Sequence, residues 1–372
     1  LAVAPDGEPA SWDPEPAVLV PGGTGGLGAV VARHLVEKGV RRLVLASRRG
    51  AAAPGAEALR AELAAAGAEV TLAACDVADR AAVAGLLESV PSLGTAVHAA
   101  GVLDDGLVAS LTPERIEAVL RAKVDAATHL HELTLGDRAP RLVLFSSLAG
   151  TVGNTGQAAY GAANAYLDAL AVRRVAAGTP ATSIAWGLWA DESGGMGDTL
   201  SAADRARMAR SGLLPLPDAA ALALLDAAVA AADPAPVVAA LDHAALRRRV
   251  DTPAVLRALV GATAPAPRAA AVESGRRDEL VGLDAAGRRA AVLTLIRDAA
   301  AEILAHPDAA AIDPGARFVD LGLDSLTAVE LRNVLFAATE LDLPTTVAFD
   351  HPTVGELTDH VSALLAAPVA AE

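Results

Sequence analysis

Seven short apolar runs bounded by turn residues recur along the first 241 residues, and this alternation constrains the fold more than any other feature of the sequence. Segments with apolar residues at helical spacing separate the runs. Runs that are apolar on both faces are typical of buried parallel strands. The sequence therefore predicts an α/β fold with a Rossmann-like, doubly wound parallel sheet. The predicted strands lie at 17–20, 43–46, 70–73, 95–98, 142–145, 182–186 and 236–241, and predicted helices include 27–38, 57–66 and 112–133.

Composition excludes several classes of protein. Of the 372 residues 53% are hydrophobic, but charged residues, glycine or proline interrupt every apolar run before it reaches the roughly 20 residues that cross a membrane. Cys75 is the single cysteine, which excludes a disulfide framework and a cysteine zinc site, and the histidines form no metal-ligating pattern. The net charge of −15 argues against a nucleic-acid partner. Because no signal-peptide pattern is present, we expect a cytoplasmic protein. Because neither the cysteine nor the histidines form a ligand pattern, we expect no bound metal.

Charge and linker composition divide the chain into two domains. From Ala285 to the end, 13 acidic residues stand against 5 basic ones, so this stretch carries −8 of the total charge. The preceding stretch, 261–275, is rich in Pro, Ala and Gly without apolar periodicity, which is typical of a linker. We therefore place the Rossmann-like domain at 13–260, the linker at 261–280 and a small all-α domain of four helices at 281–368. Its helices are expected at 288–304, from 325, and at 354–365, with a short third helix between the last two.

A glycine-rich turn follows the first strand and precedes a helix. Glycines let the backbone turn tightly and approach a pyrophosphate, whose charge is favoured at a helix N-terminus. A flexible loop is the alternative, but the strand before the turn and the helix after it favour a dinucleotide site. The predicted contacts in this turn, GGTGGLG after Pro21, are Gly22, Thr24, Gly25, Gly26, Leu27 and Gly28.

The ends of the next two strands indicate which dinucleotide would bind. The second strand ends at Ser47 and Arg48, where an acidic residue is usual for NADH and an arginine accommodates the 2′-phosphate of NADPH. These residues favour NADPH, although a merely solvated arginine is the alternative. After the third strand, Asp76 is expected to contact the adenine; a plain helix N-cap is the other interpretation.

A serine and a tyrosine provide the predicted chemistry. Ser147 ends the fifth strand and faces the ligand crevice, and Tyr160 follows 13 residues later, with Asn164 on the same helix face. A tyrosine can act as an acid for a carbonyl oxygen if a neighbouring cation stabilises its phenolate. Because Asn164 stands four residues after the tyrosine, where a cation is expected, Lys123 is the remaining candidate.

Residues from about 15 to 250 resemble the catalytic half of a modular polyketide synthase ketoreductase, a branch of the short-chain dehydrogenase/reductase family. In this branch the lysine and asparagine have exchanged places. The resemblance implies that Tyr160 donates a proton to a ketone, that Ser147 hydrogen-bonds the ketone oxygen, and that Lys123 lowers the tyrosine pKa and holds the cofactor ribose. Asn164 would support the hydrogen-bond network. The matching stretches are GGTGGLG at 22–28, SRRG at 47–50, CDV at 75–77, HAAGVLDDG at 98–106, AKVDAATHL at 122–130, FSSLAG at 145–150, YGAANAYLDAL at 160–170 and AWGLW at 185–189.

The same resemblance implies further contacts and a stereochemical type. Val77, Ala100 and Gly101 join the predicted cofactor site. The Leu-Asp-Asp signature at Leu103, Asp104 and Asp105 goes with the B-type, which gives a D-configured alcohol, and the stretch 148–159 lacks the tryptophan of the A-type. Pro21 departs from the usual threonine. A segment at 194–210 is expected to form either a lid or an ordinary surface loop.

Ser325 opens a predicted helix, and a serine there beside acidic residues suits covalent attachment of a charged group by another enzyme. A hydrolase nucleophile is disfavoured because the second glycine of the elbow and a preceding strand are missing; a plain N-cap serine is the other alternative. The segment resembles an acyl carrier protein, which makes Ser325 the 4′-phosphopantetheine attachment site. Glu340 replaces the usual glycine after the second helix. The matching stretches are LGLDSL at 321–326, ELRN at 330–333 and FDHPT at 349–353.

The two resemblances together imply an NADPH-dependent reductase of β-ketoacyl thioesters that carries its acyl chain on Ser325. A reductase-like scaffold without activity, beside a working carrier domain, is the alternative. The implied partners are an upstream structural half, a ketosynthase, an acyltransferase and, in some modules, a dehydratase or enoylreductase. A phosphopantetheinyl transferase would modify Ser325, and the assembly would be a homodimeric megasynthase without nucleic-acid or membrane contacts.

Overall fold

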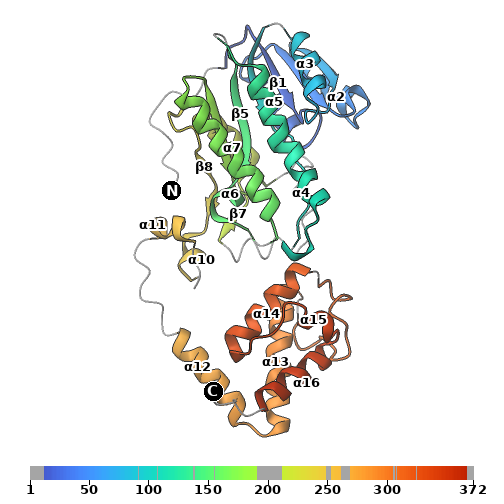
Figure 1. The fold of residues 1–372 in the computed structure, drawn as a ribbon, viewed down its shortest axis with the longest axis vertical. Coiled ribbons are helices and arrows are strands. Elements are labelled where there is room, and N and C mark those ends of the chain that lie inside the picture. Colours follow the sequence, from blue (N-terminus) through green and yellow to red (C-terminus); the bar gives the residue numbers. More distant parts are fainter. Residues whose placement is uncertain are drawn as a thin grey trace. The chain divides into compact units, whose positions relative to one another are not determined.

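The computed structural model describes residues 12–90, 92–106, 108–136, 139–154, 156–190, 212–248, 253–260, 269–304, 306, 308–323 and 325–366. The predicted lid at 194–210 lies outside these ranges. The described chain forms two compact units, one with residues 12–190 and 213–242 and the other with residues 243–366 (Figure 1).

Seven parallel strands form the main sheet of the first unit (Figure 1), in the order β3-β2-β1-β4-β5-β6-β8. This order confirms the predicted Rossmann-like, doubly wound fold. The direction of winding reverses between β1 and β4, which creates a crevice at the carboxyl ends of these strands. A second, two-stranded sheet pairs β7 (Leu213–Leu214) with β9 (Ala240–Leu241). The main strands are β1 (Ala17–Pro21), β2 (Arg42–Ser47), β3 (Glu69–Ala74), β4 (Leu93–His98), β5 (Arg141–Ser147), β6 (Ala181–Trp186) and β8 (Val237–Val238).

Helices cover both faces of the sheet because successive side chains of each buried strand point to opposite faces. In β1, Val18 and Val20 pack into one apolar layer, whereas Ala17 and Leu19 pack into the other. The first layer includes residues of α1, α2 and α9, and the second includes residues of α5 and α7. The helices are α1 (Gly26–Glu37), α2 (Ala56–Ala65), α3 (Arg80–Glu88), α4 (Pro113–Leu120), α5 (Ala126–Leu133), α6 (Leu148–Val152), α7 (Ala158–Ala176) and α9 (Asp218–Ala230), with short 3₁₀ turns η1 (Gly50–Ala52) and η2 (Val108–Ser110).

The long helix predicted at 112–133 is interrupted by a π-helical turn. Between α4 and α5, residues Arg121–Asp125 form η3, with i to i+5 hydrogen bonding. The spacing of apolar residues did not reveal this turn, because a single π turn adds only one residue to the repeat. Such turns are frequent at functional sites, and this one carries Lys123.

A buried carboxylate ties the N-terminal segment to the first unit. Asp226 on α9 is 1% exposed, and its Oδ1 atom accepts a hydrogen bond from Nε1 of Trp12 at 2.8 Å. The same oxygen lies 2.9 Å from Nε2 of His34, and Oδ2 lies 3.0 Å from Nζ of Lys38. The network therefore joins the entering chain, α1 and α9.

The second unit is all-helical in its described part, which confirms the predicted small α domain. A core of apolar side chains joins α13, α14, α15 and α16, with Phe318 and Leu323 contributed by the loop before α14. The helices are α10 (His243–Arg248), α11 (Arg257–Val260) with the preceding 3₁₀ turn η5 (Ala254–Leu256), α12 (Ala269–Gly282), α13 (Ala285–Ile303), α14 (Ser325–Thr339), α15 (Val347–Asp350) and α16 (Val354–Ala366).

The helix α12 was not expected, since it occupies part of the predicted linker. Leu280 is buried against the core of the second unit, and Arg288 donates from Nε to the Leu280 carbonyl at 3.0 Å and from Nη2 to the Val281 carbonyl at 3.0 Å. The packing of Leu280 and the hydrogen bonds of Arg288 thus stabilise α12, although its sequence has no apolar periodicity typical of a helix. The predicted domain boundaries remain a prediction.

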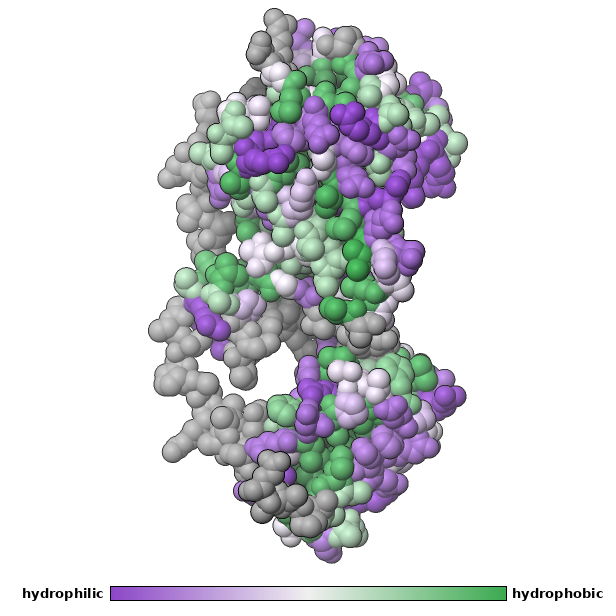
Figure 2. All heavy atoms as spheres, in the orientation of Figure 1, coloured by the Kyte–Doolittle hydropathy of each residue, from purple (hydrophilic) through white to green (hydrophobic). Residues whose placement is uncertain are grey.

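Among the described residues, neither a membrane-spanning helix nor a metal-ligating cluster is found. Hydrophilic side chains gather over α2 and α3 on the face that Figure 2 shows. Among the helices of the described ranges, none is both long and apolar enough to cross a membrane. Within the same ranges, no three His, Cys, Asp or Glu side chains come together in a way that could hold a metal ion.

Candidate active site

The glycine-rich turn is packed so tightly that three of its glycines, Gly22, Gly23 and Gly28, leave no room for a Cβ atom without displacement. Gly22 has φ +81°, and a Cβ atom there would lie 2.8 Å from the backbone nitrogen of Ala100. A Cβ on Gly28 would lie 2.1 Å from the carbonyl oxygen of Gly22. At Gly25, by contrast, an added Cβ would meet no described atom within 4 Å. The turn therefore packs on the loop after β4 through Gly22 and on itself through Gly28, and it leaves open space at Gly25.

The N-terminus of α1 in this turn fits a pyrophosphate. Gly25 is its N-cap in extended backbone, no side chain caps the helix, and the first turn holds no acidic residue. The first backbone N–H groups of a helix have no partner within the helix and carry partial positive charge. An anion can therefore approach them at the open face of Gly25. Thr24, Gly26 and Leu27 lie in the same turn.

The residues predicted to select the dinucleotide lie at the ends of β2 and β3. Ser47 is half-buried and its Oγ accepts a hydrogen bond from the Gly50 nitrogen at 3.1 Å. Arg48 is exposed, and no described residue pairs with it. Asp76 is exposed and its Oδ1 accepts from the Ala78 nitrogen at 3.0 Å. The interpretation of Asp76 as a helix N-cap is wrong, because Asp79 caps α3 by accepting from two backbone nitrogens.

The loop after β4 joins the turn to the lysine. Ala100 packs against Gly22, and a Cβ on Gly101 would lie 3.0 Å from Cε of Lys123. Val77, after β3, has its side chain buried in the core. Because Gly101 has no side chain, the Lys123 side chain can lie beside this loop. Because the Val77 side chain is buried, only the backbone of Val77 is left to contact a ligand.

Ser147 and Tyr160 lie where β5 ends and α7 begins. Ser147 ends β5 and caps α6 by accepting from the Ala149 nitrogen at 3.2 Å. Tyr160 is 9% exposed in the first turn of α7. Asn164 is fully buried one turn later; its Nδ2 donates to the Tyr160 carbonyl at 2.8 Å, and its own carbonyl accepts from Oγ of Ser146 at 3.2 Å. These bonds fix α7 against the end of β5.

Lys123 reaches the same place from the π turn. Its Nζ atom donates to the Phe145 carbonyl at 2.7 Å and lies 5.3 Å from the centroid of the Tyr160 ring. The side chain is 3% exposed, and burial lowers the pKa of Lys123 to about 8, against the attraction of Asp168, which raises it. The structure therefore brings Lys123, Ser147, Tyr160 and Asn164 together from three separate stretches of the first unit: η3, the end of β5 and α7.

The lowering of the Tyr160 pKa by Lys123 remains a prediction, because the largest effect on this pKa in the structure is burial. Burial raises the pKa of Tyr160, and hydrogen bonding with Ser147 and Asn164 lowers it only in part. The ammonium of Lys123 faces the Phe145 carbonyl and the tyrosine ring. Since a buried phenol with a raised pKa stays protonated, Tyr160 is held as a proton donor.

The Leu-Asp-Asp segment is bound by two residues that sequence reasoning missed, Arg115 of α4 and Gln157 at the start of α7. Nε of Arg115 donates to Oδ1 of Asp104 at 2.9 Å, and Nη2 of Arg115 donates to the carbonyl of Asp105 at 2.8 Å. Nε2 of Gln157 donates to Oδ2 of Asp105 at 2.9 Å. Leu103 packs with Tyr160 in one apolar cluster. The sequence contains a basic and an amide side chain, Arg115 and Gln157, that could pair with the two aspartates. Only the fold shows that these side chains contact the aspartates.

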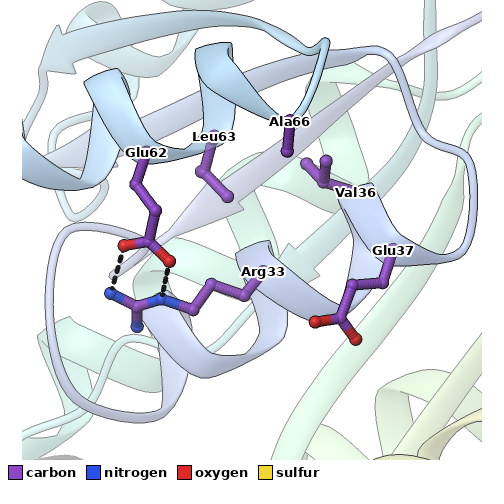
Figure 3. A pocket seen from close by; sticks show the side chains of 6 residues that line it. All are labelled: Arg33, Val36, Glu37, Glu62, Leu63 and Ala66. Atoms are coloured by element: carbon purple, nitrogen blue, oxygen red, sulfur yellow. Dashed lines mark hydrogen bonds and ion pairs between the residues drawn. The ribbon is translucent and has the colours of Figure 1, made fainter.

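A groove of about 180 Å³ between α1 and α2 is separate in its lining from the predicted site. Figure 3 shows Arg33 reaching across it to Glu62, with Nε–Oε1 and Nη2–Oε2 distances of 2.7 and 2.8 Å. No predicted site residue lines this groove; its walls are Arg33, Val36, Glu37, Glu62, Leu63 and Ala66.

In the second unit, Ser325 begins α14. The loop before it is pinned by the Phe318 nitrogen, which donates to the Pro352 carbonyl at 3.0 Å. At the other end of α14, Glu340 has φ +55°, the left-handed region that favours glycine. The serine therefore lies at a helix start, as predicted, and the helix ends in the conformation that the missing glycine would favour.

Two family models match this chain. The model described as "KR domain" matches residues 16–191, and the model described as "Phosphopantetheine attachment site" matches residues 294–361. NADPH fits the first family, and the second is the family of domains that carry phosphopantetheine. Both matches lie within the predicted domains.

The curated relatives are long multidomain synthases. Polyketide synthase GfsB of Streptomyces halstedii is 53% identical over 367 residues, which cover 95% of this chain and 7% of that protein. The pikromycin polyketide synthase component PikAII of Streptomyces venezuelae is 50% identical over 373 residues, which cover 95% of this chain and 10% of that protein. The chain thus spans only a small part of the length of these relatives.

Solved structures of ketoreductases share the fold. One described as an A-type ketoreductase from a modular polyketide synthase has a TM-score of 0.63 and 43% identity, and the match covers 70% of this chain and 55% of that one. The first ketoreductase of the tylosin synthase has a TM-score of 0.59 and 47% identity, covering 65% and 52%. The chain therefore carries a ketoreductase (KR) domain followed by a phosphopantetheine-binding acyl carrier domain, and its relatives are polyketide synthases.

Proposed function

We propose that this chain catalyses the NADPH-dependent reduction of a β-ketoacyl thioester to a β-hydroxyacyl thioester, with the acyl chain carried on phosphopantetheine at Ser325. The observation that carries the proposal is the convergence of Lys123, Ser147 and Tyr160 beside a glycine turn that fits a pyrophosphate. The alternative is a scaffold that keeps the fold without the reaction. The complete set of polar side chains, each buried or half-buried, with Lys123, Ser147 and Asn164 held by hydrogen bonds, favours the active enzyme.

The residues of the site divide the proton chemistry among them. NADPH, when bound, supplies a hydride to the ketone carbon. Tyr160 donates its phenol proton to the ketone oxygen, and the hydroxyl of Ser147 donates a hydrogen bond to the same oxygen. The phenolate that remains on Tyr160 needs a counter-charge in a buried site. Lys123, with Nζ 5.3 Å from the ring centroid, provides that charge, and Asn164 holds the turn of α7 that presents the tyrosine.

The preference for NADPH would come from the end of β2. The exposed guanidinium of Arg48 is free among described residues to pair with a 2′-phosphate, and the hydroxyl of Ser47 lies beside it in the chain. Asp76 would meet the adenine ring from the end of β3.

The stereochemical outcome would follow from the wall that contains Leu103, Asp104 and Asp105. Arg115 and Gln157 fix both acidic side chains, so this wall is held in one position relative to Tyr160. A rigid wall limits how the pantetheine arm enters and therefore which ketone face meets the hydride. We expect the B-type, D-configured alcohol, which chiral chromatography of the reduced diketide thioester would detect; a predominantly L-configured product would contradict this assignment.

A pair of tyrosine variants tests the reductase function. In a protein that also carries the upstream structural half, Tyr160→Phe should abolish NADPH consumption with a diketide thioester while NADPH binding, followed by fluorescence, stays near that of the wild type, because only the proton donor is lost. Tyr166→Phe is the matched control, since this second tyrosine on α7 bonds Oγ1 of Thr128 at 2.7 Å, outside the site. A folded wild type without turnover would favour the inactive scaffold.

Attachment of the pantetheine arm is tested separately. Incubation with a phosphopantetheinyl transferase and coenzyme A should add one phosphopantetheine mass to the wild type and to Ser362→Ala, and none to Ser325→Ala. The same added mass on Ser325→Ala would contradict the assignment.

The proposed partners follow from the length of the relatives. Because the chain covers 5% to 17% of the first five relatives, other synthase domains would act before and after it. These would be the upstream structural half of the ketoreductase, a ketosynthase, an acyltransferase and, in some modules, a dehydratase or enoylreductase, in a homodimeric assembly. Trp12, held by Asp226, would anchor the segment that enters from the structural half.

A further inference from the structure

Two imidazole rings are stacked in the second unit, and the function proposed above uses neither of them. His351 follows α15 and His360 lies on α16; their ring centroids are 3.9 Å apart, and the ring planes are inclined by 22°. Both side chains are half-buried. Stacked aromatic rings stabilise a contact beyond the area that they bury. The stack therefore fastens the connection between α15 and α16 to α16 itself.

The fastened segment pairs with the loop that precedes α14. Residues 352–355 lie antiparallel to residues 314–318. Backbone nitrogens join the two segments, with Phe318 donating to the Pro352 carbonyl at 3.0 Å, Val354 to the Ala316 carbonyl at 3.2 Å and Gly355 to the Pro314 carbonyl at 2.7 Å. His351 immediately precedes this ladder in the chain. A shift of the segment after His351 would therefore move the hydrogen-bond partners of the loop.

Phe318 relates the position of the ladder to that of Ser325. Its side chain is 1% exposed in the core of the second unit, and its carbonyl accepts from the Leu323 nitrogen at 2.9 Å. Leu323 is buried in the same core, and Ser325 begins α14 two residues later. A chain of backbone hydrogen bonds thus runs from Pro352 through Phe318 to Leu323. The backbone position of the serine depends on the segment that the stacked rings hold.

We propose that His351 and His360 are positioning residues for Ser325: their stacked rings hold the segment after α15, and with it the loop before α14, in the arrangement in which the serine is modified, and this hold weakens when both rings are protonated. The importance of the stack for modification rests on the proposed attachment of phosphopantetheine at Ser325. Two imidazolium rings at this separation repel each other, whereas a neutral ring stacks on a neutral or a charged one.

Charged groups around the pair decide when this repulsion appears. Burial and the charge of His351 lower the pKa of His360, whereas Asp350, at the end of α15, raises it. Of the other charged side chains on these segments, Asp359 bonds to Arg289 of α13 at 2.6 Å, Glu356 accepts from the Thr353 nitrogen at 3.1 Å, and Arg317 lies in the paired loop. Since the folded pKa of His360 lies below the ordinary 6.5, its neutral ring contributes full stability above pH 6.5, and this contribution is lost as the pH falls further.

Hydrogen exchange of the full chain tests the hold on the loop without requiring any modification. At about pH 7.5, exchange of the peptide covering 314–323 should be about three- to ten-fold faster in His360→Ala than in the wild type, the range expected for the loss of one aromatic pair. His360→Phe keeps a stacking ring and should match the wild type. At about pH 5 the wild type should exchange faster than His360→Phe, because phenylalanine cannot gain a proton.

The rate of phosphopantetheine transfer tests the consequence for Ser325. With a phosphopantetheinyl transferase and coenzyme A, His360→Ala should gain the arm about three-fold or more slowly than the wild type, because misplaced reacting groups slow a reaction. His360→Phe should restore the rate of the wild type. His306→Ala is the matched control: Nδ1 of this histidine of the same unit lies 2.9 Å from the Asp308 carbonyl, outside the pair, and the rate should stay unchanged.

Each outcome is decisive. Wild-type exchange of 314–323 in His360→Ala would overturn the proposal, as would a wild-type transfer rate in that variant or a folded His360→Phe that is as slow as His360→Ala. If His360→Ala does not fold, the comparison of the wild type with His360→Phe at the two pH values decides, and equal exchange at both would overturn the proposal. If the wild type gains no arm, the proposed attachment at Ser325 fails, whereas hydrogen exchange still tests the hold on the loop.

Discussion

Replacing Gly28 by alanine should destabilise the reductase domain far more than the same change at Gly25. A Cβ on Gly28 would lie 2.1 Å from the Gly22 carbonyl oxygen and 2.7 Å from its carbonyl carbon, both backbone atoms that cannot rotate away. The turn would have to open by more than 1 Å, roughly, to restore ordinary contact, and overpacking of this kind costs about 3 kcal/mol. For a domain of this size such a loss lowers Tm by roughly 6 to 12 °C.

Gly25→Ala is the matched control, because the added Cβ meets no described atom and the backbone there is extended. Its Tm should stay within about 1 °C of the wild type, as for a surface change. Since the open space at Gly25 is where we place the pyrophosphate, this variant should nevertheless weaken NADPH binding, measured by fluorescence titration. Equal Tm values for the two variants, or an unchanged Kd in Gly25→Ala, would refute the reasoning about this turn.

Three further predictions concern pH, a helix end and the cofactor. The folded pKa of Lys123, about 8, lies below its ordinary 10.5, so the cost of burying the charged side chain is full below pH 8 and is relieved as the pH rises to 10.5. Over this window the free energy of unfolding in urea should rise by about 3 kcal/mol in the wild type relative to Lys123→Met. The same pH dependence in both proteins would contradict this prediction. Glu340→Gly should stabilise the carrier domain by about 1 kcal/mol, because φ is +55° there, whereas Glu340→Ala should not. Arg48→Ala should weaken NADPH binding and leave NADH binding unchanged, with Arg49→Ala as the control; a wild type that prefers NADH would disprove the 2′-phosphate contact.

The sequence was sufficient to predict the sheet because buried parallel strands leave an unmistakable pattern. β1 is buried along its whole length, so its apolar run needs no knowledge of its neighbours. The grouping of Ser147, Tyr160 and Asn164 could also be predicted, since a strand end and one helix face place them. Lys123 could be assigned as the cation beside Tyr160 only by elimination and by the family resemblance.

Other features depend on contacts between distant residues and leave no local pattern. The π turn at Arg121–Asp125, which carries Lys123, interrupts a stretch that reads as one continuous helix, and the bonds of Arg115 to Asp104 and of Gln157 to Asp105 join segments 11 and 52 residues apart. The helix α12 depends on Leu280 and on Arg288, which lies outside the helix it caps. The net rise in the pKa of Tyr160 comes from burial, whose extent only the folded chain defines.

The central claim is that the site on the first domain reduces a chain carried by the second. Its most direct test is intact-protein mass spectrometry of the chain together with its upstream structural half, after a phosphopantetheinyl transferase has loaded Ser325 with a β-ketoacyl pantetheine. On addition of NADPH we expect the arm to gain the mass of two hydrogen atoms in the wild type and in Tyr166→Phe, and to remain unchanged in Tyr160→Phe. An arm that stays unreduced in the folded, NADPH-binding wild type, or that is reduced equally in Tyr160→Phe, would contradict the account.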